Sequence, residues 1–434
     1  MDLSTRVRIS LASPYKKMLE RAKGTKEIGP EEKILKNKIL NKITEIFELY
    51  GFYPLETPTL QRYDILASKY AGGAEILKET FQLKDQGNRE LALRYDLTVP
   101  LAIYMALNPN TKLPFKRYEI GKVFRDGPIS SERFREFWQC DVDIVGSSSM
   151  MAEAEIISLA FRVFKELELS ITLKVNNRKI LDAITRYAGI TEDKSQEVIL
   201  SIDKLDKIGN EGVKKELLEK ELTEEQVTKI LTPIMFIGSN KDKIIKLKNL
   251  LGENEGITEI QEIINYEPNV RFEISLARGL AYYTGTIFEI ELNDPKFKTS
   301  FGGGGRYDNM VGKFLDSKTK IPAVGIAFGL DRIAIALKSK EKTAAKVFII
   351  PIKTEKESFL LANVLRNNGI NTDTDLMSRS ISKNLDYANS LEIPYVIFLG
   401  EEELKQKKYK LRNMKNGREE LLDFPEIVER LKNG

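Results

Sequence analysis

Charged and amide side chains concentrate in residues 115–146, which the sequence predicts to be two strands joined by a polar loop. The first strand ends at Arg125, directly before an Asp-Gly-Pro turn signal. Alternation along the second strand predicts an apolar face of Phe134, Trp138, Cys140, Val142 and Ile144, and a polar face of Arg133, Arg135, Phe137, Gln139, Asp141 and Asp143. Because a guanidinium group matches the geometry of carboxylates and phosphates, we predict an anion site that includes Arg125, Arg133 and Arg135.

A simpler interpretation of this stretch is an antiparallel sheet with one solvated face, which requires no function. The strong apolar face favours a functional arrangement, since it fixes the register and keeps the polar side chains together on the other face. The strand pattern alone leaves both interpretations open.

Other residues that could do chemistry stand at predicted junctions between elements. Asp96 and Thr98 lie where a strand gives way to a helix, so they would cap the helix or hold an ammonium group. Tyr282 and Tyr283 lie between Gly279 and Gly285 in a predicted bend, which also presents the preceding Arg278. The two tyrosines would be core residues or would present their hydroxyls beside the arginine.

Arg332 is predicted in the first turn of a helix that follows a strand at residues 323–328. Exposed amides at a helix start favour anions, so Arg332 would complete a phosphate site or be a surface arginine. The glycine run at 302–305 has neither the Walker A spacing nor the dinucleotide-binding spacing. It is predicted to be a flexible turn or a place of close backbone approach.

The composition excludes several kinds of chemistry. The chain has no histidine and a single cysteine, Cys140, so Ser-His and Cys-His catalysis and Cys/His zinc clusters are excluded. Metal sites with oxygen ligands, such as Mg²⁺ sites, stay open. Any catalysis is expected to depend on carboxylates, arginines, lysines and positioning.

Length and charge bound the organisation of the chain. Its 434 residues allow two or three domains, and 68 basic against 64 acidic residues, a net charge of +4, favour only local contacts with a polyanion. No apolar run approaches membrane-spanning length, and the basic N-terminus has no apolar signal core. We therefore expect a cytoplasmic protein without membrane contact.

Hydrophobic periodicity predicts four segments. Residues 1–29 form a basic N-terminal arm, residues 30–190 and 263–340 an α+β domain with an antiparallel sheet, residues 191–262 an inserted helical domain with a solvated face, and residues 346–434 an α/β domain with a mostly parallel sheet. A basic cluster in the last domain is either a solubilising edge strand or a rim that faces phosphates. Its members are Lys405, Lys407, Lys408, Lys410, Arg412, Lys415 and Arg418.

Several stretches carry a resemblance to one family. The strand pair at 115–146 resembles motif 2 of class II synthetases, the region at Pro58 resembles motif 1, and GIAFGLDRI at 325–333 resembles motif 3. LARGLAYYTGTIFE at 276–289 and GGRYD at 304–308 resemble the two signatures of the histidine enzyme, and RYDLT at 94–98 resembles the archaeal and eukaryotic version of its amino-acid loop. Over essentially its whole length, the chain resembles a class II histidyl-tRNA synthetase.

The resemblance implies an activity and a set of roles. A homodimer with an α+β catalytic domain and an anticodon-binding domain would activate histidine with ATP and Mg²⁺ and transfer it to tRNA(His). Arg125 would bridge the substrate carboxylate and the α-phosphate, Arg278 would be a second cation at the α-phosphate, and Arg332 would bind the γ-phosphate. Arg133 and Arg135 would help to place the triphosphate.

The resemblance also implies a histidine-binding set. Its residues are Asp96, Thr98 and Gln139 at the α-amino group, Asp143 and Tyr283 at the two imidazole nitrogens, and Tyr282 beside them. Gln139 and Asp143 lie on one face of the predicted strand within roughly 14 Å. A polar row of this kind can hold an imidazole ring, and its unpaired groups would reject other amino acids.

Two positions depart from the pattern of the family. Ala281 stands where the family usually has an aspartate, and Gly127 stands where many class II members carry a glutamate that reads adenine. Three rival functions stay open: a regulatory subunit of histidine biosynthesis that keeps the fold without charging tRNA, an RNA-binding pseudo-synthetase, and a synthetase for another amino acid. The joint presence of Arg125, Arg278 and Arg332 and the full C-terminal domain argue against the first.

Overall fold

The computed structural model describes residues 20–69, 77–130, 132–278, 282–315, 320–338 and 341–433. The chain divides into two compact units, with a boundary between Ile335 and Ala336. Helix α1 (Pro30–Leu49) contributes residues to both units. The predicted basic arm at residues 1–29 is described only from residue 20, and Ala281 lies outside the described residues.

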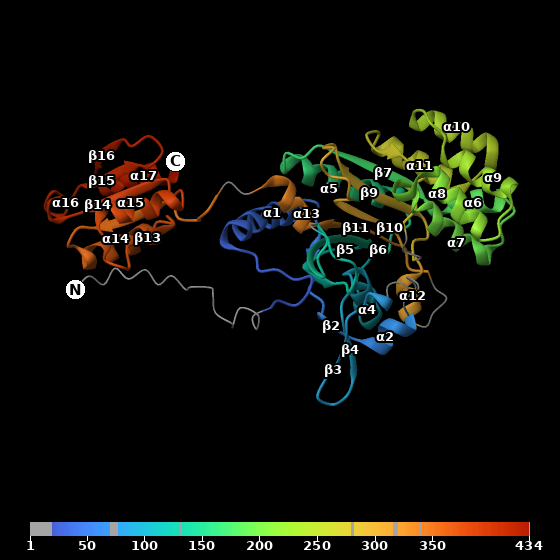
Figure 1. Ribbon diagram of the computed structural model, residues 1–434, viewed down its shortest axis with the longest axis horizontal. Coiled ribbons are helices and arrows are strands. Elements are labelled where there is room, and N and C mark those ends of the chain that lie inside the picture. Colours follow the sequence, from blue (N-terminus) through green and yellow to red (C-terminus); the bar gives the residue numbers. More distant parts are fainter. Residues whose placement is uncertain are drawn as a thin grey trace. The chain divides into compact units, whose positions relative to one another are not determined.

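The first unit is built on an eight-stranded sheet with the order β1-β5-β6-β11-β10-β9-β7-β8 (Figure 1). Its strands are β1 (Tyr53–Pro54), β5 (Phe115–Phe124), β6 (Glu136–Val145), β11 (Ala323–Gly329), β10 (Gly302–Arg306), β9 (Thr286–Leu292), β7 (Ile171–Asn177) and β8 (Arg271–Phe272). Neighbours from β5 through β7 pair antiparallel, whereas the short edge strands β1 and β8 pair in parallel. The predicted α+β fold with an antiparallel sheet is therefore confirmed.

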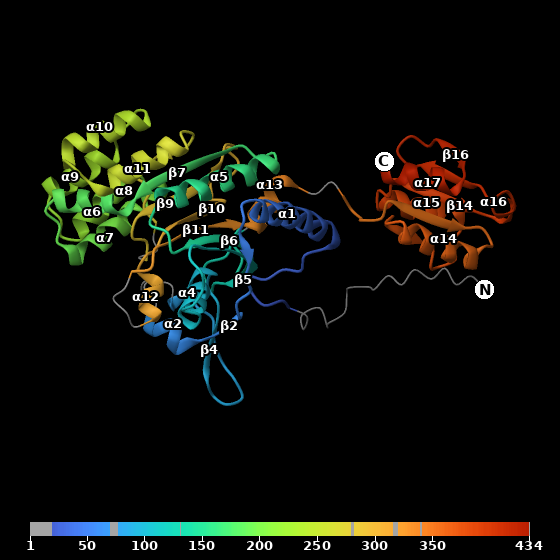
Figure 2. The same cartoon turned by 180° about the vertical axis from the view of Figure 1, so that it is seen from behind.

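One face of this sheet is apolar and packs against helices α1 and α5 (Met150–Glu166), which lie on the same side of it (Figures 1 and 2). The ring of Phe328 on β11 lies 6.1 Å from that of Phe47 on α1 and 5.9 Å from that of Phe164 on α5. Cys140 and Val142, which were predicted on the apolar face of β6, are fully buried. Burial of such rings and aliphatic side chains is the main force that holds helices on a sheet.

The opposite face of the sheet is polar, and its part around Asp141 and Asp143 is buried. Asp141 and Asp143 on β6 are each 2% exposed. Helices α4 (Thr98–Leu107) and α12 (Met310–Phe314) lie on this side (Figures 1 and 2). The first unit also contains helix α2 (Tyr63–Lys69) and a small sheet of β2 (Leu60–Arg62), β4 (Glu90–Leu93) and β3 (Gln82–Lys84). The simpler interpretation of a solvated face does not hold for Asp141 and Asp143, and these buried carboxyl groups require a structural or functional reason.

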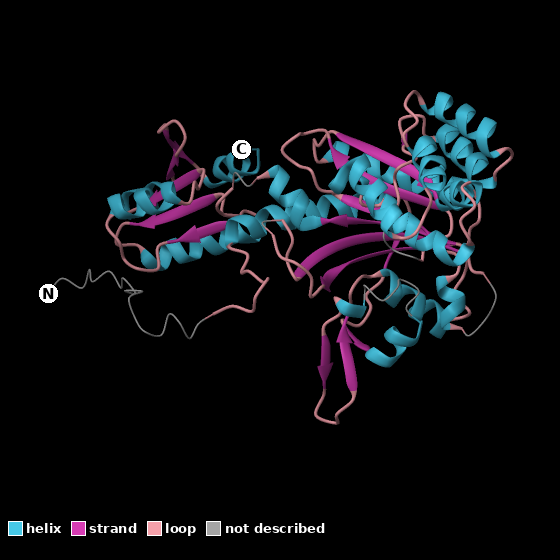
Figure 3. Cartoon of the chain, turned by 45° about the vertical axis from the view of Figure 1, so that its right-hand side comes forward, coloured by secondary structure: helices cyan, strands magenta, loops and turns pink. Residues whose placement is uncertain are grey.

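Helices occupy most of the chain between β7 and β8 and gather beside that end of the sheet (Figure 3). They are α6 (Arg178–Tyr187), α7 (Glu192–Ile202), α8 (Leu205–Glu219), α9 (Glu224–Ile234), α10 (Asn240–Leu251) and α11 (Glu255–Tyr266). Thr223 and Gln226 form the predicted capping box of α9. Helix α8 is interrupted at Gly209, where φ is 69°, so its first residues form a separate turn. No helix in the described part of the chain has the length and apolar character that crossing a bilayer requires.

Most of the second unit folds around a five-stranded sheet with the order β13-β12-β14-β15-β16. Its elements are β12 (Val347–Pro351), α14 (Glu355–Asn367), β13 (Thr372–Thr374), α15 (Ile381–Ser390), β14 (Tyr395–Leu399), α16 (Glu401–Gln406), β15 (Tyr409–Asn413), β16 (Glu419–Leu422) and α17 (Phe424–Asn433). Ile349, Leu365, Ile397 and Leu431 share one apolar core. The predicted α/β class is confirmed, but only β13, β12 and β14 are parallel. Strand β15 pairs antiparallel with β14, and a turn at Gly417 joins it to β16 as an antiparallel hairpin.

Strand β10 consists of four glycines and Arg306, and it lies inside the eight-stranded sheet. A Cβ atom at Gly304 would lie 1.9 Å from the backbone oxygen of Gly325 on β11. Only glycine permits this approach of the two backbones. Of the two predicted alternatives, close backbone approach is confirmed and a flexible turn is wrong.

We expect Gly304→Ala to destabilise the first unit by about 1–3 kcal/mol, because the added methyl group meets rigid backbone rather than a movable side chain. Gly329→Ala on β11 is the matched control, since its Cβ atom would meet nothing closer than 3.7 Å. Thermal unfolding followed by circular dichroism checks the expected order, with the lower apparent Tm for Gly304→Ala. Equal apparent Tm values would contradict this account of β10.

Candidate active site

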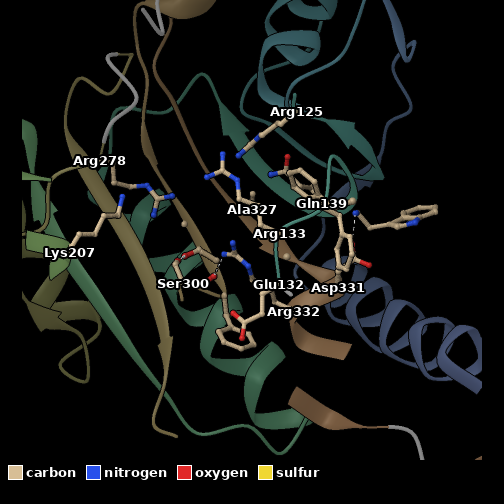
Figure 4. A pocket seen from close by; sticks show the side chains of 17 residues that line it. Arg125, Glu132, Arg133, Gln139, Lys207, Arg278, Ser300, Ala327, Asp331 and Arg332 are labelled. Carbon is tan, nitrogen blue, oxygen red and sulfur yellow. Dashed lines mark hydrogen bonds between the residues drawn. The ribbon is translucent and has the colours of Figure 1, made fainter. Parts of the chain in front are cut away.

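Two adjoining cavities lie over the polar face of the eight-stranded sheet. The larger has a volume of about 420 Å³ and the smaller a volume of about 90 Å³. They share a wall, whose residues line both: Arg125, Gln139, Arg278, Gly303 and Ala327. In Figure 4, Arg278 and Lys207 lie on one side of the larger cavity and Arg125 lies on the other. The predicted arginines at 125, 278 and 332 are thus brought together.

Positive charge dominates the larger cavity. Its cationic lining residues are Arg125, Arg133, Lys207, Arg278 and Arg332, and its carboxylates are Glu132 and Asp331. Burial lowers the pKa of Arg332, and the positive charges of Arg125, Arg133 and Arg278 lower it further against the opposing effect of Glu132. The arginines are therefore close enough to repel one another, and a polyanion such as a triphosphate would relieve that repulsion.

Two aromatic rings fix the orientation of Arg125 at the end of β5. The carbon at the centre of its guanidinium group lies 4.2 Å from the ring centroid of Tyr95 and 5.1 Å from that of Phe137. Its Nε also donates a hydrogen bond of 3.2 Å to the backbone oxygen of Tyr95. Stacking against aromatic faces holds a guanidinium plane in place, so Arg125 is positioned before any ligand binds.

Arg278 lies across the glycine strand β10. A Cβ atom at Gly303 would be 1.9 Å from Nη1 of Arg278, so the absence of a side chain makes room for the guanidinium group. The same Nη1 donates a hydrogen bond of 3.1 Å to the backbone oxygen of Phe288 and lies 3.9 Å from Glu289. Burial disfavours the charge of Arg278, but the nearby Tyr283 and Glu289 outweigh burial and raise its pKa.

Arg332 lies in the first turn of helix α13 (Leu330–Leu337), as predicted, and donates a hydrogen bond to the backbone oxygen of Ser300. Arg133 donates a hydrogen bond of 3.1 Å to Glu79. A Cβ atom at Gly127 would lie 2.7 Å from the same carboxylate. Glu79 and Arg133 therefore fill the space beside Gly127.

Arg135 does not line either cavity, so its predicted grouping with Arg125 and Arg133 is wrong. Strand β6 begins at Glu136 rather than at Arg133, and the strand alternation therefore does not extend to Arg135. Its Nη1 pairs with Asp126 at 2.9 Å. Arg135 braces the loop between β5 and β6.

Carboxyl and phenol groups dominate the smaller cavity. Its polar lining beyond the shared wall consists of Asp96, Thr98, Asp141, Asp143, Tyr282, Tyr283 and Tyr307. With Gln139 in the shared wall, all six residues predicted to bind histidine line this cavity. Oδ1 of Asp96 also accepts a hydrogen bond of 3.0 Å from the amide of Val99 in the first turn of α4, so Asp96 caps the helix, as one alternative predicted, while it lines the cavity.

A buried ion pair supports the smaller cavity from below. Nη2 of Arg117, a residue with no exposed surface, lies 2.8 Å from Oδ2 of Asp143. Oδ1 of Asp143 accepts a hydrogen bond from the hydroxyl of Tyr307. Burial disfavours the charge of Arg117, but the attraction of Asp143 and Asp141 outweighs it and raises the pKa of Arg117. The sequence analysis missed Arg117, because the register that sets it opposite Asp143 arises from the pairing of β5 with β6.

The helical segment between β7 and β8 reaches the larger cavity through Lys207. Lys207 lies in the separate turn that precedes the kink of α8 at Gly209. Asp203, just before this turn, has its pKa raised to about 6 by burial, against the opposing effects of Arg278 and Lys207. The sequence contained no local signal for this contact, because the charges of the segment at 191–262 matched an ordinary solvated face.

Comparisons with known proteins place the chain in a family. The family model for histidyl-tRNA synthetase matches residues 24–333. The chain belongs to the histidyl-tRNA synthetase family. A second family model, the anticodon binding domain, matches residues 346–434. The two matches together cover both the eight-stranded sheet and the five-stranded sheet.

Bacterial relatives of this histidyl-tRNA synthetase family are similar over nearly their whole length. A histidine–tRNA ligase 1 of Bacillus cereus is 48% identical, with 92% of this chain and 97% of that protein covered. A histidine–tRNA ligase of Clostridium tetani is 38% identical, with 94% and 97% covered. The predicted archaeal and eukaryotic branch has no support, because these relatives are bacterial.

Solved structures of the family share the fold. The histidyl-tRNA synthetase of Nostoc sp. PCC 7120 has a TM-score of 0.84 at 30% identity, over 96% of this chain and 99% of that one. A Bacillus halodurans C structure described as an ATP phosphoribosyltransferase regulatory subunit/histidyl-tRNA synthetase has a TM-score of 0.74 at 22% identity, over 88% and 98%. The second likeness concerns the fold alone.

We expect Asp203→Asn to raise the free energy of unfolding above pH 6. The raised pKa means that folding opposes ionisation of Asp203, so its cost is absent below about pH 4, grows as the pH rises, and is complete above about pH 6. A rise from 3.8 to about 6 corresponds to at most about 3 kcal/mol, and partial exposure reduces the expected gain to about 1–2 kcal/mol.

Urea unfolding at pH 4 and pH 7.5 measures this difference. Glu211→Gln, a change at an exposed carboxylate later in α8, is the control and should give a smaller gain at pH 7.5 than Asp203→Asn. A gain for Asp203→Asn that is equal at both pH values would contradict the predicted ionisation.

Proposed function

We propose that this protein activates histidine with ATP to form histidyl-adenylate and then transfers the histidyl group to its cognate tRNA. The observation that carries the proposal is the pair of adjoining cavities with opposite character. One is lined by arginines and suits a triphosphate, and the other is lined by carboxyl and phenol groups and suits an amino acid with a cationic amine and a nitrogen-containing ring.

The shared wall is where the two substrates would react. The carboxylate of histidine attacks the α-phosphorus of ATP, a new carboxyl–phosphate bond forms, and pyrophosphate departs. Arg125 and Arg278 stabilise the charge that develops on the α-phosphate, because both line the two cavities. A carboxylate is already ionised at neutral pH, so this step needs no general base, which agrees with a chain that has no histidine.

The remaining residues bind and orient the substrates. Arg332 and Arg133 hold the outer phosphates, and Lys207 adds a further positive charge there. In the smaller cavity, Asp96, Thr98 and Gln139 hold the α-amino group, while Asp143, Tyr282 and Tyr283 surround the end that receives the ring. In the second step a hydroxyl of the terminal ribose of the tRNA attacks the carbonyl carbon of the adenylate, AMP departs, and the hydroxyl loses its proton.

Mg²⁺ would enter with the nucleotide. Among the described residues there is no group of three or more acidic or cysteine side chains arranged to hold a metal. Glu132 and Asp331 line the larger cavity, and one or two carboxylates together with phosphate oxygens are the usual protein environment of Mg²⁺. The ion would supply positive charge to the pyrophosphate as it leaves.

Recognition of the tRNA anticodon is proposed for residues 346–434, and catalysis for residues 30–190 and 263–340, with residues 191–262 inserted between them. The predicted edge-strand role of the basic cluster is weak, because β16 rather than β15 forms the edge of the sheet. Arg412 and Arg418 pair with Glu419 and Glu420 at 3.3 and 2.9 Å. The lysines of the cluster are then the better candidates for contacts with phosphates.

We further propose a homodimer that works in the cytoplasm, where charged tRNA is used. Strand β1 forms one edge of the large sheet, and the exposed apolar side chains near it and beside α4 would be covered by a second copy. These side chains are Tyr53, Leu60, Leu107 and Leu113.

Exchange of labelled pyrophosphate into ATP tests the proposed activity. We expect exchange that depends on histidine and on no other of the twenty amino acids, because only histidine fills the acidic cavity. If no amino acid supported exchange, a regulatory subunit of histidine biosynthesis would be the better interpretation. Exchange with a different amino acid would assign a sister synthetase.

Arg278→Ala is expected to lower kcat of this exchange by about 100-fold or more, because Arg278 stabilises charge that develops in the transition state. The KM for histidine should change by less than about threefold. Arg271→Ala is the control, since Arg271 is 58% exposed and pairs with Glu273 away from both cavities. Equal losses in kcat and in histidine affinity would contradict the role of Arg278.

A further inference from the structure

We propose that the turn at residues 22–26, here called the N-terminal turn, holds the loop between β5 and β6 in the position that nucleotide binding requires, with Gly24 as its positioning residue. The loop comprises residues 125–135. The inference rests on the proposed function, because it takes the larger cavity as the nucleotide site. It gives a role to a segment that the sequence analysis had described only as part of a basic arm.

The loop between β5 and β6 contributes to the wall of the larger cavity. Its residues Glu132, Arg133 and Phe134 line this cavity, and Figure 4 shows Glu132 and Arg133 there. The last residue pair of the two strands is Phe124 with Glu136, so the loop lies beyond their pairing. Contacts with other segments must therefore hold the loop in place.

The N-terminal turn has a backbone shape that glycine makes possible. The amide of Thr25 donates a hydrogen bond of 3.1 Å to the backbone oxygen of Ala22, and the hydroxyl of Thr25 donates another of 2.8 Å to the same oxygen. Gly24 is the third residue of this four-residue turn, and its φ is 86°. Turns with a positive φ at the third position favour glycine there, because other residues are strained in that conformation.

Gly24 contacts the loop from both sides of the place where the loop reverses. Its backbone oxygen accepts a hydrogen bond of 2.9 Å from the amide of Arg135. A Cβ atom at Gly24 would lie 2.7 Å from Cγ of Arg135 and 3.0 Å from Cδ1 of Ile129. Ile129 precedes and Arg135 follows the bridge between Ser130 and Arg133. Gly24 therefore packs between the two arms of the loop, in a space that has no room for a side chain.

Two further contacts connect the N-terminal turn with the cavity wall. Nζ of Lys26 lies 4.9 Å from the ring centroid of Phe134, a cation–π contact with a residue that lines the larger cavity. Arg135, which packs on Gly24, pairs with Asp126 near the start of the loop at 2.9 Å. The N-terminal turn thus contacts the residues on both sides of Arg133 in the sequence.

These contacts have different consequences for the two substrates. A loop that is held in place before the nucleotide binds loses less freedom on binding, so the contacts favour nucleotide affinity. Among the described residues of the loop, only Arg125 lines the smaller cavity. Loss of the contacts should therefore weaken nucleotide binding much more than histidine binding.

Two matched pairs of full-length variants test this role: Gly24→Ala with Gly29→Ala, and Lys26→Met with Lys23→Met. A Cβ atom at Gly29 would meet nothing within 4 Å, and Lys23 is an exposed residue of the same turn. Deuterium exchange of residues 125–135, followed by mass spectrometry without ligands, measures how firmly the loop is held. Calorimetric titration with Mg-ATP measures nucleotide binding, and pyrophosphate exchange gives the KM for histidine.

We expect Gly24→Ala to speed deuterium exchange of the loop and to weaken ATP binding by about 5- to 20-fold, because the added methyl group is strained at this φ and meets the loop. The KM for histidine should change by less than about twofold. Lys26→Met, which removes the contact with Phe134, should weaken ATP binding by about two- to fivefold. Gly29→Ala and Lys23→Met should leave both loop exchange and ATP binding unchanged.

Unchanged loop exchange or unchanged ATP affinity in Gly24→Ala would overturn the role of the N-terminal turn. Equal losses of ATP and histidine affinity would also overturn it, since a general loss of structure has that effect. If Gly24→Ala does not fold, the comparison of Lys26→Met with Lys23→Met decides, and equal ATP affinities of these two variants reject the role. Failure of the proposed function is a separate result, because the unchanged protein would then show no histidine-dependent pyrophosphate exchange, whereas deuterium exchange of the loop needs no substrate.

Discussion

Like charges are gathered into two groups on one face of the same sheet, and the rest of the site depends on that arrangement. Carboxyl groups collect on β6. The fully buried Arg117 on the neighbouring strand β5 offsets the repulsion between them by pairing with Asp143. The arginines of the larger cavity come from the residue after β5, the loop between β5 and β6, the segment before β9, and the first turn of α13: Arg125, Arg133, Arg278 and Arg332. Each group would be costly to hold without its counter-ions. A negatively charged nucleotide would reduce the repulsion among the arginines, and an amino acid with nitrogen groups would reduce the repulsion among the carboxyl groups.

Bare backbone is what permits the two groups to lie side by side. Gly303 and Gly325 occupy neighbouring antiparallel strands, and a methyl group at either position would occupy the space of Arg278 or Asp143. Glycine at these two positions therefore lets the side chains of Arg278 and Asp143 pack directly on the backbone at the centre of the sheet. β-branched residues at these positions would favour the strand conformation, but their side chains would fill the space that Arg278 and Asp143 occupy.

Much of this arrangement could be predicted from the sequence because it is local. Alternation along β6 predicted that Gln139, Asp141 and Asp143 share a face, and the strand-to-helix junction predicted the place of Arg332. The prediction for Arg135 failed because the strand begins one residue after it, where no composition change marks the boundary.

Contacts between distant parts of the chain were beyond such reasoning. Lys207 reaches the larger cavity from a helical segment about 70 residues away from Arg278 in the sequence, and nothing in its neighbourhood separates it from other surface lysines. The register that sets Arg117 against Asp143 depends on the pairing of β5 with β6. These facts arise from the whole sheet rather than from any one strand.

The common wall between the cavities also bears on inhibitor design. A compound that fills only the 90 Å³ chamber can carry little more than a single five-membered heterocycle with a short chain. Extending that chain past Arg125 and Arg278 would lead it into a space several times larger, where an acyl sulfamate or another stable phosphate mimic meets guanidinium groups. Selectivity would reside in the small chamber and most of the attainable affinity in the passage beyond it.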